Sequence, residues 1–155
     1  MILGKPVYYS TKTYGHERGI SCAFRQWRAD SHCHFIHGYA LSFKLTFGAE
    51  RLDDRNWVAD FGGLSEVKDF LETQFDHTLC VASDDPHLGT LLELEELGLA
   101  DVRVMKSVGC EATAEYVYEW VDQWIESQPS LKGRVWLHSV EVREHEGNSA
   151  IYAIE

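Results

Sequence analysis

The sequence has no long hydrophobic run and no closely spaced cysteine pair. No apolar segment reaches the roughly 18 residues of a membrane-spanning helix, and the beginning of the chain lacks the apolar core of a signal peptide. The four cysteines, at positions 22, 33, 80 and 110, contain no Cys-x-x-Cys motif and do not form the dense framework of small secreted domains. We therefore expect reduced thiols in a soluble, cytoplasmic protein that has no membrane partner.

Basic residues are also scarce. The chain has 14 Lys and Arg against 25 Asp and Glu, which gives a formal net charge of −11. Nucleic acids and anionic membranes are bound through Lys and Arg side chains that displace counterions from phosphates. The composition therefore argues against both partners. A small anionic substrate is still allowed, because Arg18, Arg25 and Arg28 lie close together in the sequence.

The length of 155 residues, 45% of them hydrophobic, suits one domain spanning 1–155. The clearest pattern is the alternation of apolar and polar residues over 39–47, which predicts a strand with one buried face. Apolar residues at helical spacing predict helices over 64–75 and 113–127, the second capped by the Thr113 hydroxyl. The remaining predicted elements are strands over 6–13, 102–107, 134–144 and 150–154, a short helix over 89–96 and a polar turn over 78–88. The main elements predict an α+β fold with the order ββααββ, a four-stranded antiparallel sheet with two helices on one face.

Half of the eight histidines lie near the beginning of the chain, at His16, His32, His34 and His37. A zinc ion needs three or four nitrogen, sulfur or oxygen ligands, and a catalytic zinc site keeps one position open. His16 ends the first predicted strand and His37 begins the second, so pairing of these strands would bring the two rings together. Clustered histidines also occur as ordinary loop residues that form hydrogen bonds, and the pattern leaves both interpretations open.

Other side chains offer acid–base chemistry. Cys33 stands four residues before His37, and a nearby metal or positive charge would favour its thiolate. Otherwise Cys33 is a small buried hydrophobic residue. Asp76 and His77 are adjacent after the first long helix, where they form either a proton relay or a favourable helix end. Glu144 ends an apolar strand face and is either a solvated edge residue or an acceptor for paired N–H donors of a ligand.

Five segments occur in the order and spacing of one known family. They are CHFIHGYALSFKL, WVADFGGL, QFDHTL, EATAEYVYEWV and VEVREHEGNSAIY. Through them the chain resembles the family of 6-pyruvoyl-tetrahydropterin synthase and 6-carboxytetrahydropterin synthase over nearly its whole length. The resemblance implies the tunnelling fold (T-fold), in which the sheets of several subunits join into a barrel. It also implies active sites at subunit interfaces and a homo-oligomer, commonly a homohexamer.

The reaction that the resemblance implies is a Zn²⁺-dependent lyase reaction. It converts 7,8-dihydroneopterin triphosphate, the small-molecule substrate, to 6-carboxy-5,6,7,8-tetrahydropterin with loss of triphosphate, in the 7-deazaguanine (queuosine) pathway. By the same resemblance Cys33 is the base that abstracts a proton, and Asp76 and His77 are its relay partners. The residues assigned to substrate binding are Glu144, which would anchor the amino and ring N–H groups of the pterin, and Thr113 and Glu115 near the same pocket.

The family's metal ligands are matched only in part. The family takes one histidine from the end of its first strand and two from a His-Gly-His motif. His16 is assigned to the first position and His37 to the second, but Tyr39 stands at the third, so His32 is assigned as the third ligand. An alternative alignment sets SCAFR against the first-strand motif and puts Phe24 at the first position. His16 is preferred for its distance along the chain, which makes GISCAFRQWRADS an insertion.

Two further hypotheses follow from these departures. One is 6-pyruvoyl-tetrahydropterin synthase activity, because small differences in how the substrate side chain is held decide the product. The other is a zinc-free, non-catalytic T-fold protein that binds a pterin or a purine, which the presence of Tyr39 favours. The metal content of the purified protein distinguishes the enzyme from the binding protein.

Overall fold

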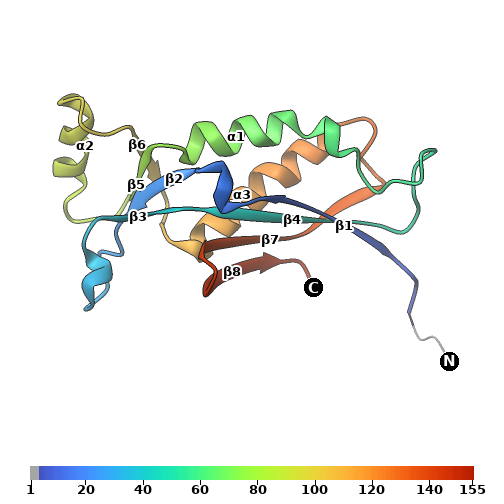
Figure 1. Ribbon diagram of the computed structural model, residues 1–155, viewed down its shortest axis with the longest axis horizontal. Coiled ribbons are helices and arrows are strands. Elements are labelled where there is room, and N and C mark those ends of the chain that lie inside the picture. The colour runs from blue at the N-terminus through green and yellow to red at the C-terminus, as the bar shows by residue number, and fades with distance from the viewer. Residues whose placement is uncertain (1–3) are drawn as a thin grey trace.

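One antiparallel sheet organises most of the chain. The computed structural model describes residues 4–155, and Figure 1 shows the arrangement of their helices and strands. The strands of this sheet, in spatial order, are β1 (Tyr8–Tyr14), β4 (Ser42–Ala49), β7 (Val135–His145) and β8 (Asn148–Ala153). Every neighbouring pair is antiparallel. Phe43, Leu45 and Phe47 of β4 are fully buried, so the predicted alternation does give a strand with one face in the core.

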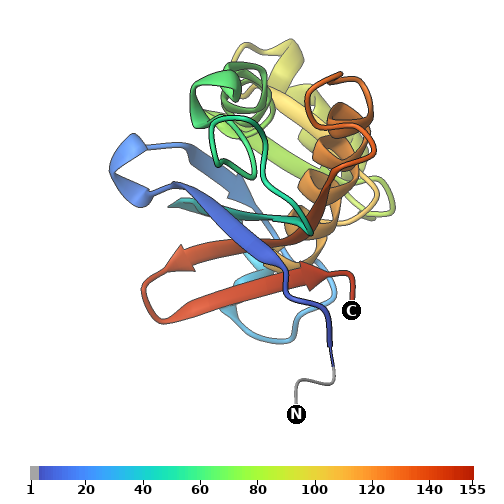
Figure 2. The same cartoon turned by 90° about the vertical axis from the view of Figure 1, so that its right-hand side faces the viewer.

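Two amphipathic helices cover one face of this sheet. They are α1 (Ser65–Phe75) and α3 (Cys110–Glu126), and Figures 1 and 2 show both on the same side of the strands. Their buried faces, which include Val67 and Leu71 of α1 and Val117 and Val121 of α3, join the strand residues in one hydrophobic core. The predicted fold class, an antiparallel four-stranded sheet with these two helices on one face, is confirmed.

A second sheet, which the sequence analysis did not predict, packs at one end of the molecule. Its strands, in spatial order, are β3 (His37–Ala40), β2 (Ser21–Phe24), β5 (Thr78–Ala82) and β6 (Val102–Met105). β2 is antiparallel to β3, whereas β2–β5 and β5–β6 are parallel. The short helix α2 (Leu88–Glu96) packs on this sheet. The segment interpreted as an insertion therefore supplies strand β2.

Two boundaries also differ from prediction. The strand predicted over 39–47 is divided at Leu41, whose N–H donates to Ile20 O, so β3 and β4 belong to different sheets. The polar turn predicted over 78–88 begins as strand β5, all of whose residues are buried. A strand buried on both faces has no alternating pattern of apolar and polar residues, whereas the polar residues that follow it are typical of a turn.

The structure also corrects the start of the second long helix. α3 begins at Cys110, after Gly109, whose φ of 107° lies in a region that favours glycine. Thr113 N–H donates to Gly109 O, so Thr113 lies in the first turn and does not cap the helix.

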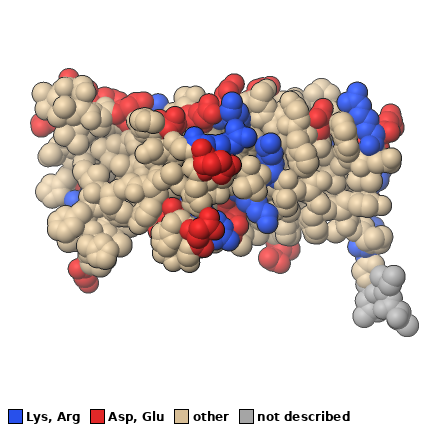
Figure 3. Space-filling view, in the orientation of Figure 1, with Lys and Arg blue, Asp and Glu red and all other residues tan. Residues whose placement is uncertain are grey.

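The described surface carries mixed charges. On the face drawn in Figure 3, basic side chains lie among acidic ones. Within residues 4–155, no helix is both long and apolar enough to cross a membrane.

Candidate functional site

The pairing of β2 with β3 brings three rings together. In this ladder Phe24 lies opposite His37, and Cys22 lies opposite Tyr39. The ring centroids of Phe24 and His37 are 5.2 Å apart, and those of His37 and Tyr39 are 5.5 Å apart. Phe24 and Tyr39 complete the group at 6.1 Å. We call Phe24, His37 and Tyr39 the aromatic triad.

Backbone contacts fix the orientation of the triad's imidazole. His37 Nδ1 lies 2.7 Å from Phe35 O. Because a carbonyl oxygen only accepts hydrogen bonds, Nδ1 carries the proton and Nε2 is the unprotonated nitrogen of the neutral ring. His16, in the 3₁₀ turn η1 (His16–Arg18), is held in the same manner, with Nδ1 2.5 Å from Ala40 O and Nε2 3.9 Å from Glu146 Oε1.

Tyr39 lies among acidic groups. Burial raises the pKa of the Tyr39 phenol above its ordinary value, and the nearby Glu144, Cys33 and Cys110 raise it further. The phenol is therefore neutral at physiological pH and is a hydrogen-bond donor. Burial, followed by the charges of Glu144 and Glu111, likewise raises the pKa of the Cys110 thiol to about 12.

Glu144 reaches this region through an irregularity in β7. Arg143 pairs with Ser149 and His145 with Asn148, so Glu144 is the extra residue of a β-bulge. Bulges of this kind redirect side chains at sheet edges and near binding sites. The depression that Glu144 lines has a volume of about 370 Å³, and its other lining residues are Cys110, Glu111, Gly147, Asn148 and Ser149.

Cys33 is held at the same end of β2. It lies in the 3₁₀ turn η2 (His32–His34), where Ser31 Oγ accepts a hydrogen bond from Cys33 N–H at 3.3 Å. Cys33 O accepts from Gln26 N–H, and Gln26 Nε2 donates to Val108 O at 2.7 Å, which ties η2 to the approach to α3. The half-buried thiol is close enough for its charge to act on Tyr39. The structure thus places both Cys33 and Glu144 near Tyr39.

Asp76 and His77 form a pair at the other end of β2. His77 Nδ1 lies 2.7 Å from Asp76 Oδ1, and Ser21 N–H donates to Asp76 Oδ1 at 3.3 Å. Ser21 and Phe24 are the two ends of β2, about 10 Å apart in an extended strand. The His77 side chain is 82% exposed. Within one chain, this pair is therefore separate from Cys33.

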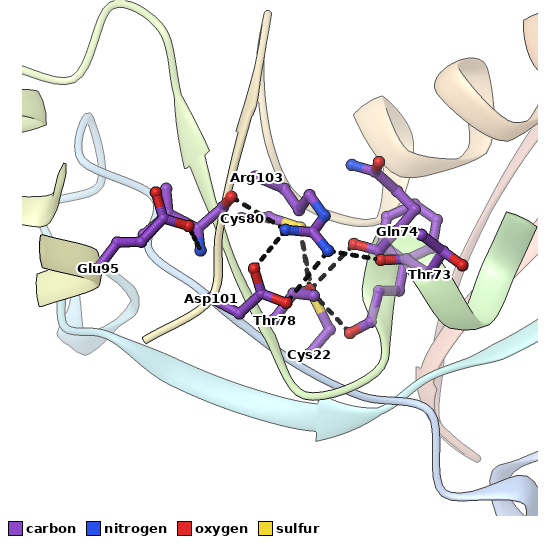
Figure 4. Close-up of polar contacts among 10 residues, drawn as sticks. Cys22, Thr73, Gln74, Thr78, Cys80, Glu95, Asp101 and Arg103 are labelled. Carbon is purple, nitrogen blue, oxygen red and sulfur yellow. Dashed lines mark hydrogen bonds and ion pairs between the residues drawn. The ribbon is translucent and has the colours of Figure 1, made fainter. Parts of the chain in front are cut away.

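A polar cluster above two buried cysteines fixes the corner that carries this pair. Figure 4 shows Arg103 of β6 between Asp101 and Thr73; its Nη2 donates to Thr73 O at 2.9 Å and to Asp101 Oδ2 at 3.1 Å. Cys22 Sγ and Cys80 Sγ are 3.5 Å apart beneath it. Their hydrogen bond and burial raise the pKa of Cys22. The same hydrogen bond lowers the pKa of Cys80 against the opposing effect of burial, so Cys22 is the donor and Cys80 the acceptor. The pairing of β2 with β5 brings these two cysteines together from distant parts of the chain.

The other predicted site residues lie elsewhere. Thr113 is buried inside α3. Glu115 lines a separate small depression with Lys106 and Ser107, so it does not share the depression of Glu144. His32 is exposed in η2. The position of Cys110 beside Glu144 was not predicted, and nothing in the local pattern distinguishes this cysteine from the others.

The donor groups do not fit a zinc site. Within residues 4–155, no three His, Cys, Asp or Glu side chains converge as metal ligands. His16 does not lie opposite His37, because β1 pairs with β4 and not with β3. The triad offers one imidazole nitrogen, one neutral phenol and the hydrocarbon ring of Phe24, whereas Zn²⁺ needs at least three N, S or O ligands. Zinc ligation by His16, His37 and His32 stays a prediction that this geometry does not support.

Comparisons with known proteins identify relatives of this chain. The family model described as 6-pyruvoyl tetrahydropterin synthase matches residues 15–155. A 6-carboxy-5,6,7,8-tetrahydropterin synthase from Rickettsia felis is 32% identical over 62 residues, which are 39% of this chain and 45% of that protein. The chain thus matches less than half the length of this relative. A synthase of the same name from Aquifex aeolicus is 25% identical over 155 residues, covering 98% of this chain and 92% of that protein.

Solved structures show the same fold. An uncharacterized protein from Wolinella succinogenes superposes with a TM-score of 0.80 at 21% identity, covering 97% of this chain and 99% of that one. The 6-pyruvoyl tetrahydropterin synthase of Caenorhabditis elegans gives a TM-score of 0.63 at 17% identity, covering 99% of this chain and 100% of that one. These similarities confirm the predicted tunnelling fold.

Proposed function

Since this chain belongs to the 6-pyruvoyl tetrahydropterin synthase family, we propose that it is a pterin lyase of the 6-carboxytetrahydropterin synthase type. The proposed substrate is 7,8-dihydroneopterin triphosphate. The product is 6-carboxy-5,6,7,8-tetrahydropterin, formed with uptake of water and with loss of triphosphate and of the two outer side-chain carbons as acetaldehyde. The names of the Rickettsia felis and Aquifex aeolicus relatives support this choice over the 6-pyruvoyl product.

The observation that carries the proposal is the gathering of Glu144, Tyr39 and Cys33. Glu144 lines an open depression of about 370 Å³, where its carboxylate can accept the paired N–H groups at one edge of a pterin. A carboxylate that accepts two such bonds orients a flat ring strongly. Cys33 lies near Tyr39, and we propose that its thiolate removes a proton from the side chain that extends from the ring.

The relay pair enters this proposal through a second copy of the chain. Asp76 and His77 are separate from Cys33 in one chain, and the exposed His77 imidazole is free to face a neighbour. β1 and β8 are the open edges of the main sheet and expose Tyr8, Tyr9 and Ile151. Open edges with exposed apolar side chains favour pairing with another chain. We therefore propose a homo-oligomer, a homohexamer by the family resemblance, with sites shared between copies.

The proposed steps use only acid–base groups of the chain. Cys33 accepts the substrate proton, and the Asp76–His77 pair returns a proton on the other side, because the Asp76 carboxylate holds the imidazole in one orientation. Zn²⁺ is part of this chemistry by the family resemblance. Since the ligand set in the structure does not fit it, no step is assigned to the metal.

A second function is favoured by the aromatic triad. With Phe24 and Tyr39 in place of two histidines, the fold suits a zinc-free protein that binds a pterin or a purine without converting it. Such a protein would keep the Glu144 depression, because ring recognition needs no metal.

One experiment decides between these functions. The purified protein is incubated with 7,8-dihydroneopterin triphosphate, and both binding and product are followed, by calorimetry and by mass spectrometry. We expect 6-carboxytetrahydropterin to accumulate in proportion to enzyme. Tight binding with unchanged substrate would establish the binding protein, and an absence of binding would contradict both functions. A 6-pyruvoyl product would reassign the reaction within the family.

A further inference from the structure

The aromatic triad occupies the place where the family resemblance locates the metal ligands. Those ligands come from the end of one strand and from the two ring positions of a His-Gly-His motif. Here Phe24 ends β2, and it lies opposite His37 in the ladder that also positions Tyr39. The structure therefore supports the alternative alignment, in which SCAFR corresponds to the first-strand motif and Phe24 replaces the first histidine.

Phe24 changes the chemistry of this place more than Tyr39 does. Its ring is 4% exposed and has no lone pair to donate. The centroid distances of 5.2 Å to His37 and 6.1 Å to Tyr39 are those of packed aromatic rings, which attract one another through edge and face contacts. The Phe24 ring thus fills space that a coordinated ion and its ligands would need. The triad keeps one imidazole nitrogen, that of His37, as a metal ligand.

We propose that this chain acts without Zn²⁺ and that the aromatic triad replaces the metal site. In this site Tyr39 donates a hydrogen bond from its phenol to the ligand that Glu144 anchors. The ligand class, a planar heterocycle with adjacent N–H donors such as a dihydropterin, rests on the proposed function. The inference that zinc does not bind is independent of the proposed function, because it rests on the chemistry of the three side chains.

The position of Tyr39 supports a direct role in binding. Its ring centroid lies 6.2 Å from that of His145, the residue that follows Glu144, so the Tyr39 ring packs against the end of β7 that borders the depression. A carboxylate accepts hydrogen bonds and a neutral phenol donates one, so together they recognise a ring that presents both donors and an acceptor. Tyr39→Phe removes the hydroxyl and preserves the ring packing.

Zinc binding is tested first, by elemental analysis of protein purified without chelators and by competition with a chromogenic chelator. We expect wild type to hold far less than one Zn²⁺ per chain. The double variant Phe24→His/Tyr39→His restores three imidazoles with His37 and should hold about one Zn²⁺ per chain. Phe24→His/Tyr39→Phe is the matched control, with one imidazole fewer, and should bind much more weakly.

The wild-type measurement is decisive even if the double variant fails to fold. Near-stoichiometric zinc in wild type, lost in His16→Ala or His37→Ala, would overturn the inference and establish the histidine site predicted from sequence. Circular dichroism of each variant separates loss of a ligand from loss of the fold.

Ligand binding is tested separately, by titration with 7,8-dihydroneopterin in the presence of EDTA. We expect the chelator to leave the wild-type affinity unchanged and Tyr39→Phe to weaken binding about 2- to 10-fold. An unchanged affinity of Tyr39→Phe would overturn the role of the phenol. A zinc-free protein with no pterin affinity would support the metal-free triad while contradicting the proposed function, so the two failures are distinguishable.

Discussion

Phe24, the last residue of β2, lies directly opposite His37, the first residue of β3, and their ring centroids are 5.2 Å apart. This pairing decides how the chain aligns with its family, because it identifies β2 as part of the second sheet and not as an insertion. It also shows that His16 does not face His37, since the strand that precedes His16 pairs with β4 and the His16 ring contacts the backbone at Ala40. Candidate chemistry therefore concentrates on Cys33, Tyr39 and Glu144.

Cys33→Ala is expected to eliminate turnover and to leave pterin binding nearly unchanged. The thiol is the proposed base, whereas ring recognition depends on Glu144. Product formation is measured by mass spectrometry and affinity by calorimetry on the same preparation. Cys22→Ala is the control, because Cys22 is buried against Cys80 and away from the depression. Full turnover by Cys33→Ala would show that another group removes the proton.

Glu144→Ala is expected to weaken binding of 7,8-dihydroneopterin by about 1–3 kcal/mol, because the ring's N–H donors would be left unpaired in the complex. Glu111→Ala is the matched control: Glu111 lines the same depression and carries the same charge, but it is exposed at the start of α3. Calorimetric titration of both variants measures the difference. Equal losses would mean that only the local negative charge matters.

The pH dependence of alkylation should distinguish the thiols. The pKa of Cys110 is raised to about 12, so this thiol is protonated and unreactive at pH 8. The half-buried Cys33 is expected to react with iodoacetamide at that pH, while buried Cys22 and Cys80 are shielded. Peptide mass mapping over time identifies the modified residues. In Glu144→Gln, the loss of a negative charge should lower the pKa of Cys110 and speed its reaction at high pH.

The sequence predicted local structure well and long-range pairing poorly. The alternation in 39–47 correctly identified buried Phe43 and Leu45, because a half-exposed strand records its environment residue by residue. Strand β5 is buried on both faces and left no such record. The aromatic triad depends on which residue of β2 faces His37, and register between distant strands is set by packing that no single segment encodes.

For the candidate site, too, contacts between neighbouring residues are easier to predict than contacts between distant segments. The roles of Cys33, Asp76, His77 and Glu144 came from a family resemblance and stay predictions. The hydrogen bond between adjacent Asp76 and His77 is local. The proximity of Tyr39 to Glu144 is not local, since it joins β3 to a bulge near the end of β7.

A buried ion pair should stabilise the loop that follows β2. Arg25 Nε lies 3.1 Å from Asp85 Oδ2, and the Asp85 side chain is 1% exposed. Asp85→Asn removes one partner and leaves a guanidinium with little access to water, so we expect unfolding to become easier by about 3 kcal/mol. Asp84→Asn is the control, because the Asp84–Arg28 pair is solvent-exposed and should contribute much less to stability. Urea denaturation followed by tryptophan fluorescence measures both, and similar effects would contradict this assignment.

Mixing of inactive variants tests whether sites are shared between copies. Cys33→Ala and His77→Ala should each be inactive, because each lacks one proposed acid–base group. If Cys33 of one copy works with Asp76 and His77 of another, mixed oligomers contain some sites with every group intact. Dissociating the two variants, combining them and reassembling them should therefore restore part of the activity, whereas each variant treated alone stays inactive. Failure to recover activity in verified mixed oligomers would place both groups in one chain, and would require a movement of the corner that Arg103 holds to α1.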